Sequence, residues 1–501
     1  CETTVTLTRS PDLYVSSLAL GRCSRLFVLF CPVVVCLCAK MPSNNVKVIT
    51  SSKQVTAESN RREIQNMVML GSAFMVMFTA FNTMENLEKP FLASATEDDP
   101  TFTADGYVAL GILYLFFGIS LWLAPSIISL IGPRVALAIS SLGYSAFIAS
   151  FYLRKTWLVY GGSVVNGLSA ALLWTAQGNY TILNSRPKTI TRNTSIFWVL
   201  FKCSLFFGNA FVFFMFRGKT RIDYDTGNTV IIVLFSVAAF ATFLMLFLRK
   251  PEHESQKRDE ASLWASRVSF IAEAGPMEAF TRSVRLALKP RILMLCPLFC
   301  YFGFQVSYHS GIYSACVGFT RNLGEDSKKL IPLVGIFIGL GELVTGSILI
   351  LKGTHFSKFK WGGVWIVSTG FVVQATCFFL VFLNLPNSAV FGDTYDTAIL
   401  TSNIPLCLLC GMMIGIGDGC FTSQIYSLLE TMYPNDSSQT VALFNFINAL
   451  ASATSFYSST MLGLHTQLVI LVLTGLTGSI GYAVVTGQVK RGVASQALST
   501  H

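Results

Sequence analysis

The chain has 501 residues, of which 52% are apolar and only 12% are charged, and its formal net charge is +10. A charged fraction about half that of a soluble domain excludes an ordinary soluble protein, whereas a bilayer can solvate the outer faces of apolar helices. The basic residues are spread over short connections between apolar runs, so the positive charge predicts membrane topology and no nucleic-acid partner. Most of the thirteen cysteines lie in or beside apolar runs and are interpreted as small apolar side chains, without a metal site or cofactor.

Residues 1–63 read as an N-terminal tail. The first residue is Cys1 and the first methionine is Met41, so residues 1–40 are expected to be either a fragment of something longer or translated upstream sequence, and not part of the mature protein. The 13-residue apolar stretch Leu26–Cys38 is too short to span a bilayer and contains Pro32, although its length suits the core of a signal peptide. We therefore leave this region out of the predicted fold.

Twelve apolar runs long enough to span a bilayer follow in chain order, each needing about 20 residues. They predict an all-α, polytopic membrane protein with twelve transmembrane helices in two six-helix bundles, residues 64–248 and 292–487, joined by a linker at 249–291 and followed by a tail at 488–501. Within the linker, Met277–Leu288 is expected to be amphipathic. The runs are Ile64–Met84, Tyr107–Ile131, Val135–Leu153, Leu158–Leu183, Ser195–Phe216, Thr229–Leu248, Ile292–Tyr313, Leu330–Leu351, Gly363–Leu383, Ile404–Leu429, Thr440–Leu462 and Leu468–Gly487.

The distribution of Lys and Arg predicts that both termini are cytoplasmic. From Met41 onward, the tails and loops on the side of the N-terminus hold 22 basic residues, against 9 on the opposite side. Basic residues are enriched in cytoplasmic loops. Without the long linker the difference shrinks to 13 against 9, so the linker carries most of the signal.

Three ionisable residues fall inside predicted spans: Lys202 in the fifth, Glu342 in the eighth and Asp418 in the tenth. Such groups are costly in a bilayer and mark functional positions by default. His309 is expected to lie near the outer end of the seventh span, where water solvates it. No nucleophile–base pair, phosphate loop or metal motif is present in the sequence, so no catalytic residue and no enzyme activity is predicted.

Lys202 and Glu342 are expected at a similar depth. Counted at the helical rise, Lys202 lies about 10 Å and Glu342 about 13 Å from the cytoplasmic ends of their spans. In two-bundle transporters the fifth and eighth spans commonly face each other, so we hypothesise an ion pair that joins the two halves. The alternative is that Lys202 extends to the membrane surface while Glu342 is protonated or locally hydrogen-bonded.

The fourth and tenth spans carry further polar groups that could line a cavity. Gly411, Gly415 and Gly419 form a small-residue stripe beside Asp418, which favours close helix packing over a ligand site. Each span has a Gln near its cytoplasmic end with a Tyr close behind, and interhelical hydrogen bonds explain these amides as readily as a substrate site does. The candidates are Trp174, Gln177, Asn179 and Tyr180 in the fourth span and Gln424 in the tenth.

Several sequence segments together resemble the uncoordinated ninety-three-like family of the major facilitator superfamily, from about residue 64 to the C-terminus. They are MLGSAFMVMFTAFNTMEN (69–86), LWTAQGNYTILNS (173–185), RNTSIFW (192–198), SLFFGN (204–209), GIFIGLGELVTGS (335–347) and GIGDGCFTSQ (415–424). The resemblance implies twelve spans around a central cavity. Gly132, Pro133 and Arg134 stand where transporters of the superfamily carry a basic cytoplasmic-loop motif, but the acidic residue and basic run of that motif are missing here.

Two functions remain open from the sequence, and the first of them is preferred. The resemblance favours a non-enzymatic accessory that regulates or escorts another membrane protein, such as an ion channel or receptor. The intramembrane carboxylates Glu342 and Asp418 favour a secondary solute carrier that works by alternating access, with a small solute and proton coupling. Besides the lipid bilayer, the expected partner is therefore either a membrane protein or a solute, and the membrane is either the plasma membrane or that of the endolysosomal system.

The topology makes a first testable prediction. The glycosylation sequons at Asn193 and Asn435 lie in predicted cytoplasmic loops, and the sequon at Asn179 lies inside a span. Glycosylation requires lumenal exposure, so enzymatic deglycosylation of the protein from eukaryotic membranes should leave its gel mobility unchanged. A glycan at Asn193 or Asn435 would show that the orientation is inverted.

Overall fold

The computed structural model describes residues 51–186, 189–216, 222–250, 281, 285–358, 361–433 and 437–499. The chain divides between Asn60 and Arg61, and everything below concerns the unit from Arg61 to His501. The expectations for residues 1–40 and for most of the linker lie outside the described residues, as does the sequon at Asn435.

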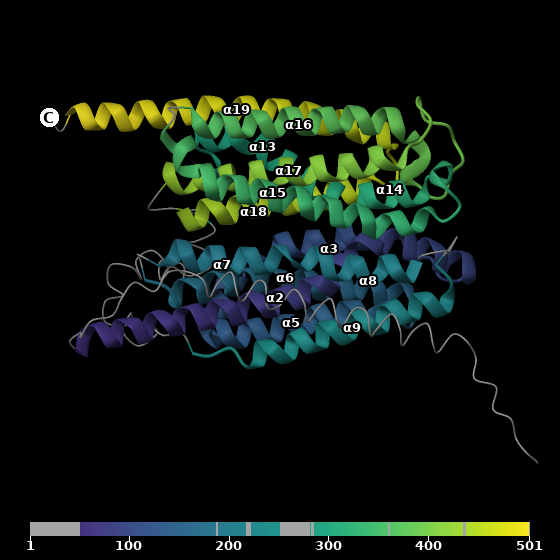
Figure 1. The fold of residues 1–501 in the computed structure, drawn as a ribbon, viewed down its shortest axis with the longest axis horizontal. Coiled ribbons are helices and arrows are strands. Elements are labelled where there is room, and N and C mark those ends of the chain that lie inside the picture. The colour runs from purple at the N-terminus through teal and green to yellow at the C-terminus, as the bar shows by residue number, and fades with distance from the viewer. Residues whose placement is uncertain are drawn as a thin grey trace, which may run out of the picture. The chain divides into compact units, whose positions relative to one another are not determined.

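The described residues are almost entirely helical, and the long helices run side by side (Figure 1). We call the side on which α9 and α19 end the tail side, and the opposite side the far side. The α-helices are α2 (Ser51–Asp98), α3 (Gly106–Ser120), α4 (Ala124–Ile131), α5 (Pro133–Ser150), α6 (Thr156–Leu183), α7 (Ile190–Lys202), α8 (Ser204–Phe216), α9 (Tyr224–Leu246), α13 (Pro290–Ser307), α14 (Tyr313–Phe319), α15 (Leu330–Lys358), α16 (Gly362–Asn384), α17 (Ile404–Met432), α18 (Ser437–Ser458) and α19 (Leu464–Ser499).

Short irregular helices complete the described chain. A π-helix, η1 (Tyr308–Ile312), joins α13 to α14, and the 3-10 helices are η2 (Arg321–Leu323), η3 (Ser327–Lys329) and η4 (Asn387–Val390). A single β-bridge between Thr320 and Thr394 is the only strand-like pairing within the described residues.

The apolar helices confirm a multi-pass membrane protein, but not the count of twelve spans. Within the described residues, nine helices are long and apolar enough to cross a membrane, or ten if the bent pair α3–α4 is one span. Two of the predicted runs, Val135–Leu153 and Thr440–Leu462, correspond to α5 and α18, which are not among the nine. Serines in α5 and asparagines in α18 lower the hydropathy of these helices, and they face other helices in the fold, as for example Ser145 faces Thr242 at 3.1 Å.

Several predicted boundaries were wrong. The first run was expected to end at Met84, but α2 continues to Asp98, because the polar residues that follow Met84 are enclosed by other helices. The second run bends by 66° between α3 and α4. The seventh run continues through η1 and α14 to Phe319, so His309 lies inside the span instead of near its end. The last helix also runs past Gly487 to Ser499.

Two apolar cores organise the described helices. The first is built from α2 to α9, between Met67 and Leu248, with Ile331 of α15 added. The second is built from the helices after Ile292, with Tyr107 and Leu110 of α3 added. Figure 1 shows the same grouping, with the green and yellow helices above the purple and teal ones.

The two groups of helices meet where α3 packs on α18 and α8 packs on α15. Gly118 of α3 leaves room for Ala449, since a Cβ added there would lie 3.1 Å from the Ala449 Cβ. The ring of Tyr114 lies 5.5 Å from that of Phe456. Small and aromatic residues therefore alternate along this contact, as in other helix–helix interfaces in membranes.

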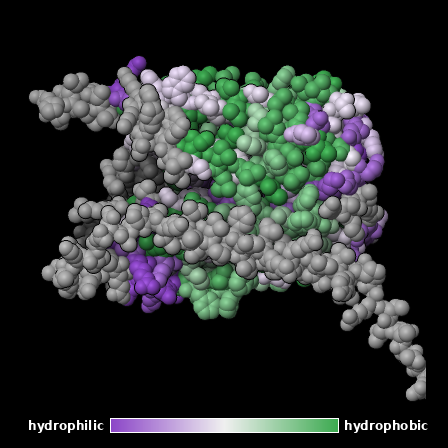
Figure 2. Space-filling view, in the orientation of Figure 1, coloured by the Kyte–Doolittle hydropathy of each residue, from purple (hydrophilic) through white to green (hydrophobic). Residues whose placement is uncertain are grey.

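Large apolar side chains are exposed on the outward faces of the helices, for example Phe243 at 53% and Val372 at 61%. The space-filling view shows a broad apolar surface over the helices of the second group (Figure 2). An apolar surface of this extent is solvated by lipid chains in a membrane protein. The outward faces therefore account for the lipid contact predicted from composition.

The glycine stripe of α17 packs against α15. A Cβ added at Gly415 would meet the carbonyl oxygen of Ile338 and would lie 2.9 Å from the Glu342 nitrogen. On the opposite helix, a Cβ added at Gly341 would lie 2.8 Å from the Ile416 nitrogen. The two backbones therefore touch, and this contact sets the positions of Glu342 and Asp418 beside it.

Alanine at this contact should destabilise the protein. Gly341→Ala and Gly415→Ala each force the two backbones apart, and we expect a loss of about 1–3 kcal/mol, measured by thermal unfolding in detergent. Gly346→Ala in the same helix α15 is the matched control, because nothing lies within 4 Å of a Cβ at that position. Equal effects at Gly346 and Gly341 would contradict the packing explanation.

Candidate functional site

A central cavity of about 260 Å³ lies between the two groups of helices. Its polar lining comes from α2, α3, α7, α8, η1, α15 and α18, while aromatic rings from α2, α5 and α6 form much of the remaining wall. Its lining includes the polar or aromatic residues Glu85, Tyr114, Tyr144, Trp174, Lys202, Ser204, His309, Ser310 and Glu342. This mixture of an apolar wall and a few polar groups is typical of small-molecule sites.

The structure brings Lys202, Glu342 and Asp418 together: Lys202 and Glu342 line the cavity, and Asp418 lies beside them. The Lys202 ammonium lies 2.8 Å from a Glu342 carboxylate oxygen and 3.8 Å from one of Asp418. The carboxylate side chains are only 4% and 7% exposed, whereas the Lys202 side chain is 29% exposed into the cavity. Because Lys202 belongs to the first group of helices and both acids to the second, these ion pairs connect the two groups.

The local backbone geometry favours a cation at Lys202. Lys202 is the last residue of α7, and the helix breaks at Cys203 before α8 begins at Ser204. The carbonyl groups at a helix C-terminus favour a cation. On the other side, the Gln305 amide donates to Asp418 at 3.1 Å, so this acid is held by one cation and one amide.

The π-helix η1 also contributes to the cavity. His309 and Ser310 both line it, and the His309 Nδ1 lies 3.1 Å from the Gln305 carbonyl oxygen. A π-helical turn inserts an extra residue and is frequent at functional sites. The sequence analysis missed His309 as a cavity residue because the apolar run alone does not show that the helix continues.

The carboxyl groups on α2 were also missed. Glu85 lines the central cavity and accepts a hydrogen bond of 2.8 Å from the Tyr114 hydroxyl. The fully enclosed Glu88 follows three residues later. The sequence did contain a sign that the helix continues past these acids, because the apolar residues Phe91 and Leu92 follow them. The structure shows that both are buried.

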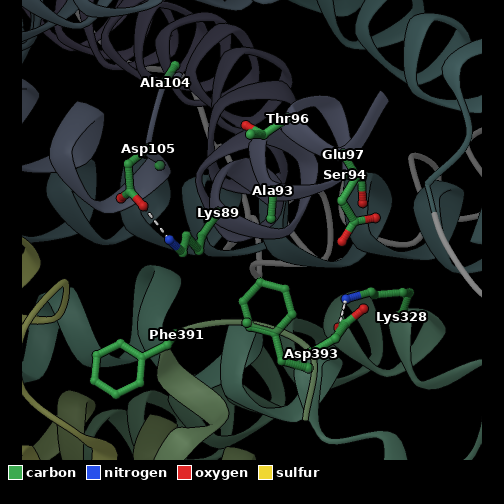
Figure 3. Close-up of a pocket in the computed structure, with 13 residues that line it drawn as sticks. Lys89, Ala93, Ser94, Thr96, Glu97, Ala104, Asp105, Lys328, Phe391 and Asp393 are labelled. Atoms are coloured by element: carbon green, nitrogen blue, oxygen red, sulfur yellow. Dashed lines mark hydrogen bonds and ion pairs between the residues drawn. The ribbon is translucent and has the colours of Figure 1, made fainter. Parts of the chain in front are cut away.

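A second, larger pocket of about 380 Å³ opens on the far side and is lined by both groups of helices (Figure 3). Lys89 pairs with Asp105, and Lys328 pairs with Asp393. Glu97 lines the same pocket. The pocket therefore holds charges of both signs, already paired in part with one another.

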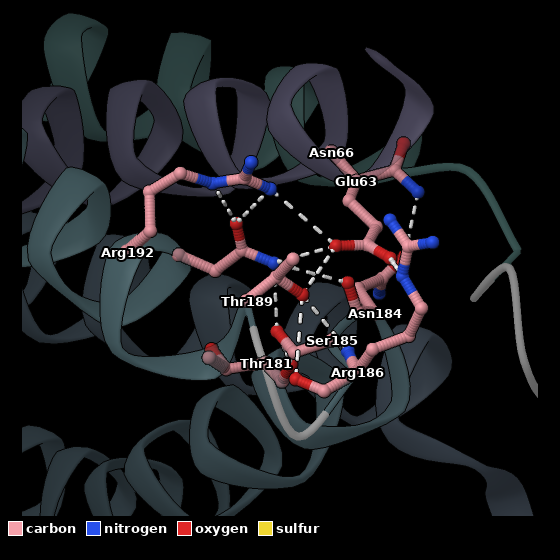
Figure 4. Close-up of polar contacts among 9 residues, drawn as sticks. Glu63, Asn66, Thr181, Asn184, Ser185, Arg186, Thr189 and Arg192 are labelled. Carbon is pink, nitrogen blue, oxygen red and sulfur yellow. Dashed lines mark hydrogen bonds and ion pairs between the residues drawn. The ribbon is translucent and has the colours of Figure 1, made fainter. Parts of the chain in front are cut away.

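A network of hydrogen bonds and ion pairs connects the helices of the first group on the tail side (Figure 4). The buried Glu63 carboxylate lies 2.7 Å from the Arg186 guanidinium and 3.4 Å from that of Arg192. The Thr189 hydroxyl donates to Glu63 at 2.6 Å, and the Asn193 amide donates to Ser185 at 2.9 Å. This network ties α2 to the turn between α6 and α7, and it encloses the Asn193 side chain at 0% exposure.

The abbreviated loop motif stabilises the end of α9. Gly132 adopts φ +79°, and Pro133 begins α5. The Arg134 guanidinium donates to the Leu248 carbonyl at 2.8 Å. The Tyr180 hydroxyl donates to the next carbonyl, that of Arg249, at 2.9 Å. These contacts satisfy carbonyl groups beyond a helix C-terminus.

The remaining predicted residues divide between the cavity and the helix packing. Trp174 lines the central cavity, with its ring centroid 6.0 Å from that of Trp198. Gln177 donates to Thr181 at 3.1 Å within its own helix, and Gln424 donates to Ser423 at 3.2 Å. Asn179 is half-buried and is not among the residues that line the cavity. No group of metal-binding side chains occurs among the described residues.

This arrangement, a polar cavity between two groups of membrane helices, defines a membrane protein with a transporter-type fold. Solved structures agree: a POT family transporter in complex with 5-aminolevulinic acid has a TM-score of 0.57 at 12% identity, covering 85% of this chain and 96% of that one. The nucleoside transporter NupG has a TM-score of 0.55 at 12% identity, covering 84% of this chain and 98% of that one. At these identities the likeness shows the fold alone.

The chain belongs to the UNC-93 family. The family model described as "Ion channel regulatory protein UNC-93" matches residues 99–482. The chain is also 35% identical over 431 residues to the UNC93-like protein MFSD11 of Xenopus laevis, covering 84% of this chain and 95% of that protein. Family and fold together describe a multi-pass membrane protein whose helices follow a transporter-type fold.

Charge reversal tests the ion pairs of the cavity. Lys202→Glu and Glu342→Lys should each lower the stability by about 2 kcal/mol, less than for a fully enclosed pair because Lys202 is partly solvated. The double variant should recover at least half of the loss, with Asp418 preventing full recovery. Thermal unfolding in detergent measures the stability of the two single variants and of the double variant.

The control is Lys329→Glu, which disrupts a half-exposed pair with Asp326 within one short helical turn and should change the stability by less than about 1 kcal/mol. A double variant no more stable than the worse single variant would show that Lys202 and Glu342 do not interact.

Proposed function

We propose that this protein binds a small polar solute in the central cavity and carries it across the membrane by alternating access. The observation that carries the proposal is the cluster of Lys202, Glu342 and Asp418, which bridges the two groups of helices at the cavity. A bridge of this kind couples solute binding to the relative movement of the groups, since a solute with its own charge competes for the same partners.

The cavity also limits the chemistry of the solute. Its volume of about 260 Å³ suits a metabolite smaller than a typical drug. Trp174, Tyr114 and Tyr144 offer flat apolar surfaces, whereas Lys202 and Glu342 offer opposite charges close together. A zwitterion or a polar molecule with one apolar face fits this lining best. Proton coupling follows if Glu342 or Asp418 exchanges its partnership with Lys202 for a proton.

The second candidate is a regulatory or trafficking accessory of another membrane protein, the function that the sequence analysis preferred. The observation that favours it is the match to a family model whose description is an ion channel regulatory protein. In this function the bridging ion pairs stabilise a scaffold, and the cavity has no solute to carry. Neutralising Asp418 would then leave the activity intact.

We also propose that α5 and α18 cross the bilayer with the other helices, giving twelve crossings in two six-helix bundles at 64–248 and 292–487. The packing of α5 against α6 and α9, and of α18 against α3 and α13, supports this count. The excess of basic residues on the tail side supports cytoplasmic termini.

A thermal-shift screen of the purified full-length protein tests the transport proposal. The panel contains amino acids, dipeptides, nucleosides and dicarboxylates, and one class should raise the unfolding temperature by about 2 °C or more at saturating concentration. The shift should disappear in Asp418→Asn and in Trp174→Ala. It should persist in the control Asp396→Asn, whose carboxylate lies in an exposed loop on the far side.

The accessory function makes the opposite prediction for the same variants. No class in the panel would shift the unfolding temperature, and affinity capture from mild detergent would recover a stoichiometric membrane protein with wild-type and Asp418→Asn alike. That pair of results would refute transport.

A further inference from the structure

Glu88 is an ionisable side chain that the proposed function does not use. It lies on α2, three residues after Glu85, and it is fully enclosed at 0% exposure. Neither of its carboxyl oxygens has a hydrogen-bond partner among the described residues. An isolated carboxylate in such surroundings is very costly, so the group needs either a partner or a proton.

The close approach of α3 explains why Glu88 is enclosed. A Cβ added at Gly106, the first residue of α3, would lie 2.6 Å from the Lys89 Cα and 3.0 Å from the Glu88 carbonyl carbon. Only a glycine allows α3 to start this close to the backbone of α2. The same contact brings the N-cap residue Asp105 to Lys89.

The charged groups that face Glu88 do not neutralise it. Glu85 lies three residues earlier on α2 and carries the same sign of charge. Lys89, the next residue in the chain, is paired with Asp105 and lies 4.8 Å from the centre of the Tyr107 ring. Within the part of the chain that the structure describes, no side chain forms a hydrogen bond with the Glu88 carboxyl group, which leaves a bound proton as the alternative.

Glu88 also stands between the two pockets. Glu85 lines the central cavity, while Lys89 and Asp105 line the pocket on the far side. Three residues on a helix correspond to about 4.5 Å along its axis, so Glu85 and Glu88 lie within one turn of each other. The Asp105 side chain is 32% exposed, which gives water access to this end of the series.

We propose that Glu88 and Glu85 form a proton-binding path along α2 between the far-side pocket and the central cavity, with Glu88 as the residue that holds the proton. In the transfer step the O–H bond of the Glu88 carboxyl group breaks, and the Glu85 carboxylate forms a new O–H bond. Glu88, now ionised, takes a proton from hydronium in the far-side pocket and leaves water. The Tyr114 hydroxyl stabilises the ionised Glu85 as the acceptor.

The use of this path in transport rests on the proposed function, but the protonated state of Glu88 does not. Infrared spectroscopy of the full-length protein in nanodiscs, without any solute, tests it at neutral pH through the carbonyl stretch of protonated carboxyl groups. We expect one such band in the wild type, its loss in Glu88→Gln, and a frequency shift in Glu85→Gln. Asp225→Asn is the control, since Asp225 is exposed and lines neither pocket, so its removal should leave the band unchanged.

Two results would overturn the proposal. If Glu88→Gln keeps the wild-type band, Glu88 holds no proton, and if Glu85→Gln leaves the band unchanged, the two carboxyl groups form no path. Should Glu88→Gln fail to fold, Glu88→Asp keeps a carboxyl group and must displace the band. A band that stays in place in that variant refutes the assignment. If the thermal-shift screen finds no solute, the infrared results can still be interpreted, because they are measured without any solute.

Discussion

A charged side chain inside a bilayer must find a partner, and the interior of this protein is arranged around that constraint. The Lys202 ammonium pairs with two carboxylates from the other group of helices, 2.8 Å from a Glu342 oxygen and 3.8 Å from an Asp418 oxygen. The cost of leaving any one of the three unpaired is what makes the contact between the groups specific. The break between α7 and α8, which leaves Lys202 at a helix end, follows the same electrostatic logic.

Close backbone contacts make this arrangement possible. The glycines at 341 and 415 allow α15 and α17 to touch, and the touching helices hold Glu342 and Asp418 on neighbouring surfaces. At Gly106 the same device lets α3 enclose Glu88. Because lipid offers no hydrophobic drive between helices, packing of this kind supplies much of the energy that holds them together.

The description of the family model differs in function from the solved transporters, which share only the fold with this chain. The helices follow the fold of solute transporters such as the nucleoside transporter NupG, whereas the family model is described by channel regulation. A two-group fold with a charged bridge can move between states whether the ligand that biases it is a solute or a partner protein. Trp174, which lines the cavity, and Asp418, which lies behind it as a partner of Lys202, separate the two functions because only transport requires a ligand in the cavity.

The sequence by itself determined the class of protein and most of the spans, because apolar length is a one-dimensional property. Depth along the helices suggested that Lys202 and Glu342 could pair, but the sequence left open whether Lys202 extends to the membrane surface instead, and the structure places the two groups 2.8 Å apart. The sequence could not place Asp418 beside Lys202 or His309 in the cavity, since these depend on how helices turn toward one another. It also ended α2 at Met84, before Glu85 and Glu88, because an acid in a sequence looks like the end of a span. Only the tertiary structure shows that α3 packs against α2 at Gly106. Because of this contact, Glu85 and Glu88, which the sequence placed in a loop, are buried between helices.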